Sequence, residues 1–512
     1  MTGSITAKTE TAAKRDGRPP NIVFIHTDSM DGRKLGCMGH PAMAGATPNI
    51  DRLAAEGTLF TQAYANNSIC CPSRASTWSG LFTHHCEGWN NFKGLAESDR
   101  TFLDDLEAAG YQSRVIGKTD FRSGHHSVRA RVTAWLRTAG FSWPVHPSID
   151  LTVTAGAGGQ GHPSEWTKAA MAVDWLGEHA KDDAPLFLYL GLRKPHFPFK
   201  TADRWFNAID PGTIDLPPTD ECTHPVVLDR GKTMSCAQEF DAATSVMLRR
   251  IYFAMIAETD AVVGTVLEGI EAAGLADSTV VVFSSDHGEL AMDHGQLYKG
   301  LAYEGSTHVP LIVRGPGLQV GQRLDTLVSL VDLYPTFMEL AGRDRPAELD
   351  GVSLVPDLSG RATAHPGWAL AEYHDTGCLT SWFMLRQDRW KYVAYPGYPS
   401  QLFDMLDDPD EVHDLAAEQP GQTAELDRRL REIVDYEAVA QKVREYDRNS
   451  FRAWREEHQA AGDYADWMAC FAAGYKNPER AAAEGAVPPS WPAADEERIE
   501  GWLNGSRRHA AQ

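Results

Sequence analysis

Residues 21–28 read Asn-Ile-Val-Phe-Ile-His-Thr-Asp, a short apolar run that ends in an acid. A continuous run of this length is typical of a strand buried on both faces, as in a parallel sheet. Residues 278–288 repeat the pattern, ending in Asp-His-Gly. Other segments alternate in the same way, with helices expected at 49–57, 237–274 and 329–342 and strands at 113–117, 185–192 and 309–313. The alternation predicts an α/β fold: a mixed, mostly parallel sheet sandwiched by helices, with sites at the strand ends.

The pattern changes near residue 365. Short stretches at 381–385, 390–395 and 401–405 are joined by polar turns, which predicts a small antiparallel sheet. After about residue 425 the chain is charged and helical, and this tail either covers a pocket or mediates assembly. We therefore expect four parts: a disordered N-terminal segment (1–20), an α/β domain with the catalytic groups (21–364), an antiparallel C-terminal subdomain (365–425) and a helical charged tail (426–512).

The composition narrows the classes of partner. The 512-residue chain has a net charge of −22 and is 43% apolar, which is typical of a soluble globular protein. Its negative field repels long polyanions, which argues against nucleic acid or intact sulfated polysaccharide as ligands. Residues 1–20 contain no apolar run, and no later run is long enough to span a membrane. With eight cysteines and no metal-finger spacing, we expect a reduced, cytoplasmic protein.

Two predicted strands end in candidate metal ligands. Asp28 ends the first strand, and Asp286 and His287 follow the later one. If both strands are central and parallel, these side chains meet at one edge of the sheet. Carboxylates with a single imidazole suit a hard cation such as calcium or magnesium better than zinc. Taken singly, Asp28 reads equally well as a helix cap and Asp-His-Gly as an ordinary turn.

The stretch Cys70-Cys71-Pro72-Ser73-Arg74 suits a reactive group that faces an anion. Proline is favoured at the first helical position, so we expect a helix that begins at Pro72. The free N–H groups of its first turn would then favour negative charge beside Cys70. Two adjacent cysteines taken alone are more often a buried structural pair.

Basic side chains lie near the predicted metal edge. Lys118 follows the strand at 113–117, and Lys299 lies twelve residues after His287. Most lysines are solvated surface groups, but the position of these two favours anion binding. The candidate proton donors are His125, His126, His196 and His224, although a lone histidine is more often structural.

Several segments together resemble the type I, formylglycine-dependent sulfatases of the alkaline-phosphatase superfamily, and most closely their arylsulfatase K branch. Residues 70–74 match the family's Cys-x-Pro-Ser-Arg signature, with Ser79-Gly80 where the family usually has Thr-Gly. Further similar segments lie at 27–33, 82–84, 89–95, 123–127, 284–294, 298–299 and 402–415. The resemblance runs from about residue 20 to 415 and implies an alkaline-phosphatase-like fold.

The resemblance also implies a chemistry. A separate formylglycine-generating enzyme would oxidise Cys70 to formylglycine (3-oxoalanine), whose hydrate attacks sulfur and later eliminates sulfate. Splitting one difficult displacement into two steps lowers the barrier to each. Calcium, or another hard cation such as Mg²⁺ or Mn²⁺, and the lysines would offset charge on the sulfuryl oxygens.

Residue roles follow from the same resemblance. Asp28, Asp286, His287 and formylated Cys70 would bind the cation. Arg74 would orient the nucleophile, Lys118 and Lys299 would hold sulfate, and His224 or His196 would donate a proton or contact substrate. The chain departs from the family pattern at Ser29, where a second acid is common, and after Lys118, where the usual histidine is missing; His125 or His126 is a candidate substitute.

We therefore expect hydrolysis of a sulfate ester, on a small sulfated sugar such as a 2-O-sulfated uronate or on an aryl sulfate. The alternative within this fold is a phosphomonoester, phosphodiester or phosphonate hydrolase. A non-catalytic binding protein is a third interpretation, which the intact Cys70, Arg74, Asp286, His287 and Lys299 set disfavours. The expected partners are a small substrate and the maturation enzyme, with a homo-oligomer also compatible.

Overall fold

The structure is a computed structural model, and it describes residues 18–123, 127–141, 151–154, 160–216, 223–233 and 240–505. Seven strands form the main sheet in the order β3-β5-β1-β7-β8-β2-β9. All neighbours are parallel except around β8, which is antiparallel to both β7 and β2. The strands are β1 Asn21–Asp28, β2 Thr58–Tyr64, β3 Gln112–Gly117, β5 Leu186–Pro195, β7 Thr279–Ser285, β8 His308–Arg314 and β9 Gln322–Ser329. The predicted mixed, mostly parallel sheet is confirmed.

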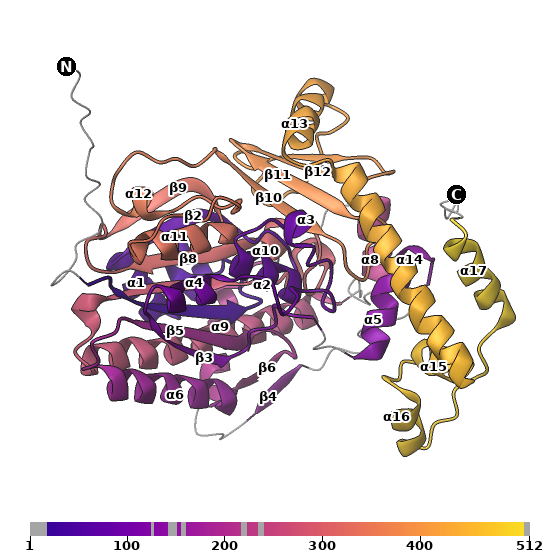
Figure 1. Cartoon of the computed structure of the whole chain (residues 1–512), viewed down its shortest axis with the longest axis horizontal. Helices are drawn as coiled ribbons and strands as arrows, with labels where there is room; N and C mark the ends of the chain where they lie inside the picture. Colours follow the sequence, from indigo (N-terminus) through magenta and orange to yellow (C-terminus); the bar gives the residue numbers. More distant parts are fainter. Residues whose placement is uncertain are drawn as a thin grey trace.

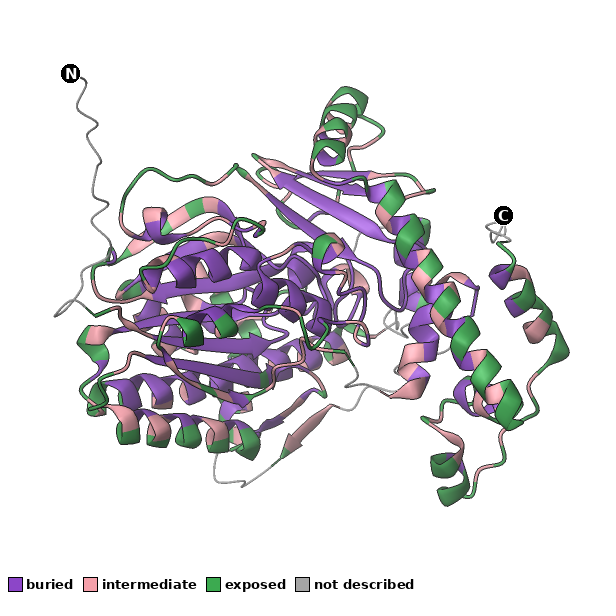
Figure 2. Cartoon of the chain, viewed as in Figure 1, coloured by how far each residue is buried: buried purple, intermediate pink, exposed green. Residues whose placement is uncertain are grey.

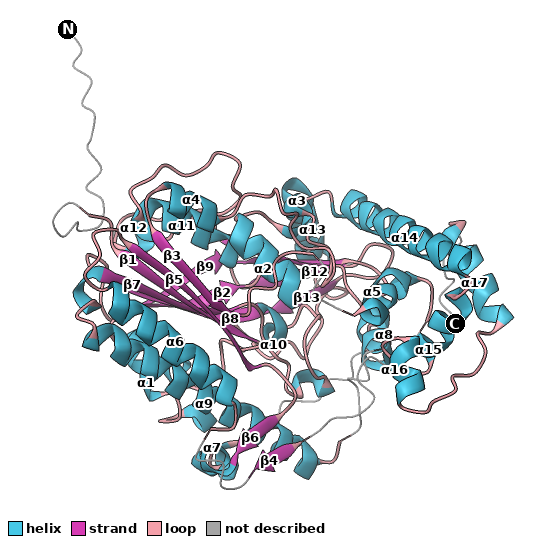
Figure 3. Cartoon of the chain, turned by 60° about the horizontal axis from the view of Figure 1, so that its bottom comes forward, coloured by secondary structure: helices cyan, strands magenta, loops and turns pink. Residues whose placement is uncertain are grey.

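Helices cover both faces of this sheet, and the central strands are buried (Figures 2 and 3). In β1, Val23 and Ile25 pack into the cluster on one face, and Ile22 and Phe24 into the cluster on the other. One face is covered by α1 Pro48–Ala55, α6 Pro163–His179 and α9 Ala242–Ala272, and the other by α2 Cys70–Ser79, α4 Phe102–Ala108 and α11 Leu333–Leu340. Burial on both faces explains why these strands are continuously apolar in sequence.

The strand register brings the predicted site residues to one edge of the sheet. Thr27 of β1 pairs with Ser285 of β7, so the next residues along, Asp28 and Asp286, lie side by side. On the other side of β1, Asp28 pairs with Pro195 of β5, one residue before His196. β3 pairs with β5 up to Gly117, the residue before Lys118. Parallel strands thus deliver four chemical groups from distant parts of the sequence to their carboxyl ends.

A second, antiparallel sheet follows the main one in the chain (Figure 1). Its strands are β10 Trp368–Tyr373, β11 Trp382–Gln387, β12 Trp390–Ala394 and β13 Gln401–Asp404. The last three agree with the predicted strands, while β10 was not singled out in the sequence. Helix α13, Pro420–Ile433, packs on one face of this sheet, and the predicted boundary at residues 425–426 falls inside it.

The tail packs against the protein rather than extending away from it. Its helices are α14 Tyr436–Ala461, α15 Tyr464–Ala472, α16 Pro478–Ala483 and α17 Ala493–Leu503. Apolar side chains of α14, α15 and α17 form one cluster with those of α5 Val128–Trp135 and the short helix η3 Leu136–Thr138. The shorter elements elsewhere are α3 Thr83–Cys86, α7 Asp203–Ala208, α8 Pro225–Thr233, α10 Glu304–Thr307, α12 Val355–Leu358, β4 Thr152–Thr154 and β6 Lys200–Ala202. Within the described ranges, no helix combines the length and the apolar character that crossing a bilayer requires.

Candidate active site

The helix that carries the cysteine signature begins earlier than the sequence predicted. α2 starts at Cys70, so Pro72 is its third residue and not its first. The difference is physically tolerated because none of the first four N–H groups of a helix has a partner within the helix. Cys70 therefore belongs to the first turn itself, and its side chain is held by regular helical backbone.

The first turn of α2 is also less open to an anion than expected. The backbone N–H of Cys71 donates to Asn91 Oδ1 at 3.0 Å, and that of Ser73 donates to the carbonyl of Ile69 at 3.0 Å. Pro72 has no N–H to offer. Because most of these donors are used or missing, the helix N-terminus does not supply the anion site that the sequence suggested, and charged side chains must do so.

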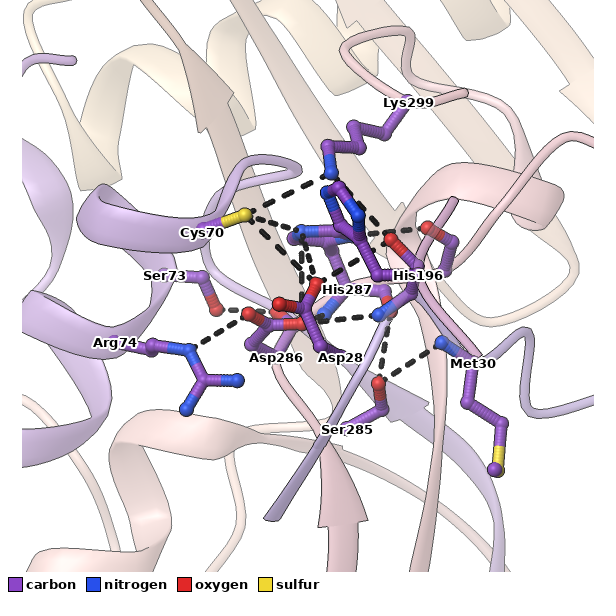
Figure 4. A network of polar contacts seen from close by, with 12 residues as sticks. Asp28, Met30, Cys70, Ser73, Arg74, His196, Ser285, Asp286, His287 and Lys299 are labelled. Atoms are coloured by element: carbon purple, nitrogen blue, oxygen red, sulfur yellow. Dashed lines mark hydrogen bonds and ion pairs between the residues drawn. The ribbon is translucent and has the colours of Figure 1, made fainter. Parts of the chain in front are cut away.

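Four potential ligands meet at the carboxyl edge of the sheet (Figure 4). One donor atom from each of Asp28, Cys70, Asp286 and His287 lies within 4.8 Å of all the others. Asp28 and Asp286 end neighbouring parallel strands, and Cys70 reaches them from α2. All four side chains are buried. The structure thus brings together the complete set that the sequence predicted.

The chemistry of this donor set fits a hard cation. His287 Nδ1 donates to the carbonyl of Gly288 at 2.9 Å, and this bond leaves Nε2 without a proton. Burial lowers the pKa of His287 to about 4, so the ring is neutral at physiological pH. Burial alone would raise the pKa of Asp28, but the charge of Lys118 and its neighbours holds it well below the ordinary value. Two carboxylates and one neutral imidazole are ligands that calcium or magnesium accepts.

Arg74 holds one of these carboxylates in place. Its Nε donates to Asp286 Oδ2 at 2.8 Å, and both side chains are fully buried. It also donates to the hydroxyl of Tyr189 at 2.7 Å and to the carbonyl oxygens of Lys118 and Thr27, each at 3.1 Å. Burial disfavours the charged guanidinium, yet the Asp286 carboxylate keeps the pKa of Arg74 above its ordinary value. In this structure Arg74 therefore orients Asp286 and contacts Cys70 through no bond of its own.

The two predicted lysines contact different members of the donor set. Lys118 forms an ion pair with Asp28, and this carboxylate raises the pKa of Lys118 despite its burial. Lys299 Nζ lies 3.6 Å from Cys70 Sγ and 3.4 Å from Ser29 Oγ. Two ammonium groups beside one buried cysteine provide the positive charge that an anionic substrate needs.

Ser29 replaces the second acid at this site. Its hydroxyl donates to Asp28 Oδ1 at 3.4 Å and accepts from Lys299, so it joins a ligand to a lysine. Asp31 lies elsewhere, because its carboxylate binds Arg33 at 2.8–3.1 Å.

Cys70 itself is a protonated thiol in this environment. Burial, with help from the nearby Asp28 carboxylate, raises its pKa to about 11. A thiol is nucleophilic only as the thiolate. At neutral pH the unmodified cysteine is therefore a poor nucleophile, although its surroundings are those of a reactive centre.

The candidate histidines have different surroundings. His196 lies in the polar network of Figure 4, and its Nδ1 contacts the carbonyl of Phe197 at 2.7 Å. Burial and the charge of Lys299 lower the pKa of His196 well below its usual value. His224 instead contacts the carbonyl of Pro399 at 2.9 Å and packs on Tyr395, with no bond to the four-ligand set among the described residues. His125 and His126 lie outside the described residues, so their roles remain predictions.

Two supporting groups were not predicted from the sequence. The hydroxyl of Tyr189, in β5, contacts both Arg74 and the carbonyl of Lys118. Asn91 accepts from the first turn of α2, as described above. A polar hydroxyl within the apolar run of β5 was a usable signal for Tyr189, because a buried hydroxyl needs a partner. Nothing in the local sequence separates Asn91 from its neighbour Asn90.

The fold and the site together define a hydrolase of the sulfatase class. Residues 20–343 match the family model described as Sulfatase, and residues 292–438 match one described as N-sulphoglucosamine sulphohydrolase, C-terminal. The chain therefore belongs to the sulfatase family and is a sulfuric ester hydrolase, as its motifs predicted.

Individual proteins that resemble this chain in sequence or in structure agree with the family assignment. Arylsulfatase K of Bos taurus is 39% identical over 466 residues, which cover 85% of this chain and 86% of the relative. The solved phosphonate monoester hydrolase of Agrobacterium radiobacter has a TM-score of 0.67 at 24% identity, covering 81% of this chain and 95% of that one. A structure described as a 2-O GAG sulfatase has a TM-score of 0.65 at 24% identity, covering 81% and 92%. At such identities the two structures show a shared fold, whereas the sequence relative confirms the predicted resemblance.

Proposed function

We propose that this sulfatase uses a formylglycine made from Cys70 to hydrolyse the ester of a small sulfated molecule. The observation that carries the proposal is the position of Cys70, which lies within one buried set with two carboxylates and a neutral imidazole, and beside Lys299. The high pKa of the unmodified thiol supports conversion, because the thiol is a poor nucleophile and a hydrated aldehyde offers hydroxyl groups instead.

Each neighbouring side chain has a task in this proposal. Lys299 and Lys118 attract the sulfate group and offset the charge that grows on its oxygens. Arg74 keeps Asp286 in position, and Ser29 joins Lys299 to Asp28. Of the two candidate histidines, His196 is the better placed to contact the substrate, since it shares the network and His224 contacts Pro399 instead. Its Nδ1 proton is used by the carbonyl of Phe197, so its other ring nitrogen accepts a hydrogen bond.

A divalent cation completes the site, held by Asp28, Asp286, His287 and the converted residue 70. When bound, it supplies positive charge that polarises the sulfuryl oxygens and favours the deprotonated nucleophile. We expect removal by a chelator to suppress turnover, with calcium, magnesium or manganese tested separately for recovery. Cation-induced change in the melting temperature should be lost in Asp286→Ala. A cation shift of equal size in that variant would contradict the ligand assignment.

The proposed substrate is a small sulfated sugar, such as a 2-O-sulfated uronate, or an aryl sulfate. The relative named Arylsulfatase K supports an ester of this kind. The net charge of −22 favours a small anion over a long sulfated polymer, since a long polymer would meet the repulsive field of the whole surface.

The deciding experiment compares kcat/KM on matched aryl sulfate, phosphate and phosphonate esters that share one leaving group. The fold is shared with a phosphonate monoester hydrolase, so the fold alone does not set the preference. We expect sulfate to be hydrolysed with the highest kcat/KM. A clear preference for either phosphorus ester would overturn the proposed sulfate specificity.

The proposed maturation is tested separately by mass spectrometry. The peptide containing residue 70 should show the change from thiol to aldehyde in active preparations. Activity should rise in proportion to the converted fraction when a formylglycine-generating enzyme is co-expressed. Full activity from a preparation with only unmodified Cys70 would refute the aldehyde mechanism.

A further inference from the structure

The peptide bond between Cys70 and Cys71 is held from outside its helix. The N–H of Cys71 belongs to this peptide unit, and it donates to the side chain of Asn91 at 3.0 Å. Cys71 is fully buried, so without this acceptor the N–H would have neither protein partner nor easy access to solvent. Because the same peptide unit carries the Cα of Cys70, its orientation sets the direction of the Cys70 side chain.

Asn91 is itself fixed by the loop around it. The Asn90 side chain accepts from the N–H groups of Phe92 and Lys93, each at 3.0 Å, which closes a tight turn. The loop then passes close to α2: a Cβ at Gly94 would come within 2.7 Å of Cys71 Sγ. The acceptor is therefore part of a packed turn rather than a mobile side chain.

The backbone of Asn91 is anchored by a distant segment. Its N–H donates to Asp375 Oδ2 at 2.8 Å, and Asp375 lies just beyond β10 of the second sheet. Asp375 is only 2% exposed, and its other oxygen accepts from the N–H and the hydroxyl of Thr376. Both carboxylate oxygens are thus committed, and one of them carries the connection from the second sheet to the turn beside α2.

We propose that Asn91 is a positioning residue for the nucleophile, and that Asp375 holds Asn91 in place for this task. The second sheet then acts on catalysis through two hydrogen bonds, one donated by the Asn91 N–H to Asp375 and one donated by the Cys71 N–H to the Asn91 side chain. The proposal rests on the proposed function in one respect, the identity of residue 70 as the nucleophile. It assigns no substrate contact to Asn91, whose effect passes through the peptide unit of residues 70 and 71.

The test compares Asn91→Ala with Asn91→Asp. Alanine removes the acceptor, whereas aspartate keeps an oxygen at the same distance from the backbone and suits a helix N-terminus. Using full-length protein and the ester that the wild type hydrolyses fastest, we expect kcat of Asn91→Ala to fall at least about tenfold, since small displacements of a reacting group are costly. KM should stay within about twofold, and Asn91→Asp should retain kcat within about threefold. Asp375→Ala should lower kcat in the same direction.

Two controls separate positioning from other causes. First, each rate is divided by the fraction of residue 70 that is converted, measured by mass spectrometry, so that poor maturation is not mistaken for poor positioning. Second, Asp99→Ala is the matched control variant, because it removes a side-chain hydrogen bond from the same segment without touching α2. The proposal would be overturned if Asn91→Ala kept the wild-type kcat per converted site. It would also be overturned if Asn91→Ala and Asn91→Asp lost kcat equally. Failure of the proposed nucleophile has a different signature, because Cys70→Ala would then keep its turnover, whatever the ratio between the Asn91 variants.

Discussion

Cys70 and Cys71 are adjacent in α2 but have different surroundings. Cys70 Sγ lies 3.3 Å from His287 Nε2 and 3.6 Å from Lys299 Nζ, among charged groups. Cys71 Sγ faces the carbonyl of Arg122 at 3.8 Å, and burial holds its pKa well above the ordinary value. Successive residues of an α-helix point in directions about 100° apart around its axis, so only one of two adjacent residues faces the sheet edge. The difference in environment assigns the chemistry to Cys70.

We predict that Cys70→Ala abolishes turnover while the protein stays folded, because the substitution removes the nucleophile and only a small buried group. Cys71→Ala should retain activity within about tenfold and lose a modest amount of stability from the cavity. Steady-state rates and melting temperatures of both variants provide the measurement. Similar residual rates in the two variants would contradict the assignment.

At the scale of elements, a buried ion pair joins α3 to β10 of the second sheet. His84 Nδ1 lies 2.7 Å from one oxygen of Glu372, and His374 Nε2 lies 3.3 Å from the other. Burial opposes ionisation of Glu372, but His84 and His374 lower its pKa to about 2. Burial opposes the charged form of His84 as well, yet Glu372 raises its pKa. Each group therefore stabilises the charged form of the other.

This pair predicts a pH dependence of stability with a definite sign. Glu372 has a folded pKa below its ordinary 4.5, so its contribution is present above that pH and is lost as pH falls toward about 2. His84 has a raised pKa, so its contribution is present below its ordinary 6.5 and is lost as pH rises through the raised value. The carboxylate shift corresponds to about 3 kcal/mol.

We therefore expect Glu372→Gln to lower the melting temperature most near pH 5–6. The difference from the wild type should shrink by more than half at pH 3, and it should also decrease at alkaline pH as His84 loses its proton. Thermal unfolding across this range is the measurement. A constant difference at all pH values would show that the lost contribution is packing and not charge.

Elements with continuous apolar runs were predictable, because burial on both faces leaves a strong signal in strands such as β1 and β7. Their terminal acids then located the ligand set. The direction of β8 was not predictable, since its run looks the same in either orientation. The start of α2 was missed because a proline is tolerated anywhere in the first turn. The role of Asn91 was not predictable, because it depends on Asp375, a partner almost three hundred residues away in the chain. The residues next to Asn91 in the sequence do not indicate that contact.

At the scale of the whole molecule, the charged tail is tied to the body by a buried ion pair. Arg137 of η3 donates from Nε to Asp447 Oδ2 of α14 at 3.0 Å, and both side chains are fully buried. Arg137 Nη1 also donates to the carbonyl of Cys378 at 3.3 Å, close to Asp375. Around the pair, Trp454 and Trp502 of the tail pack with Trp135 of α5. The sequence left two roles open for the tail, covering a pocket or mediating assembly, and neither is needed to explain these contacts. The contacts make the tail an internal brace that packs against the rest of the protein.

The buried pair predicts how the brace responds to mutation and pH. Burial outweighs Arg137 and raises the pKa of Asp447 to about 7, so the folded state binds a proton more tightly than the unfolded state. Stability from this group is therefore greatest at low pH and falls as pH rises toward about 7.

Arg137→Ala leaves the carboxylate without its partner, and at pH 8 we expect the free energy of unfolding to fall by about 3–5 kcal/mol. At pH 5.5 the loss should be smaller, because Asp447 can take up a proton. The double variant Arg137→Met/Asp447→Leu should recover most of the stability at pH 8. Hydrogen exchange of the α14 amides, together with the melting temperature, measures both effects. If Arg137→Ala loses the same stability at pH 5.5 and at pH 8, packing and not the buried charge joins the tail to the body.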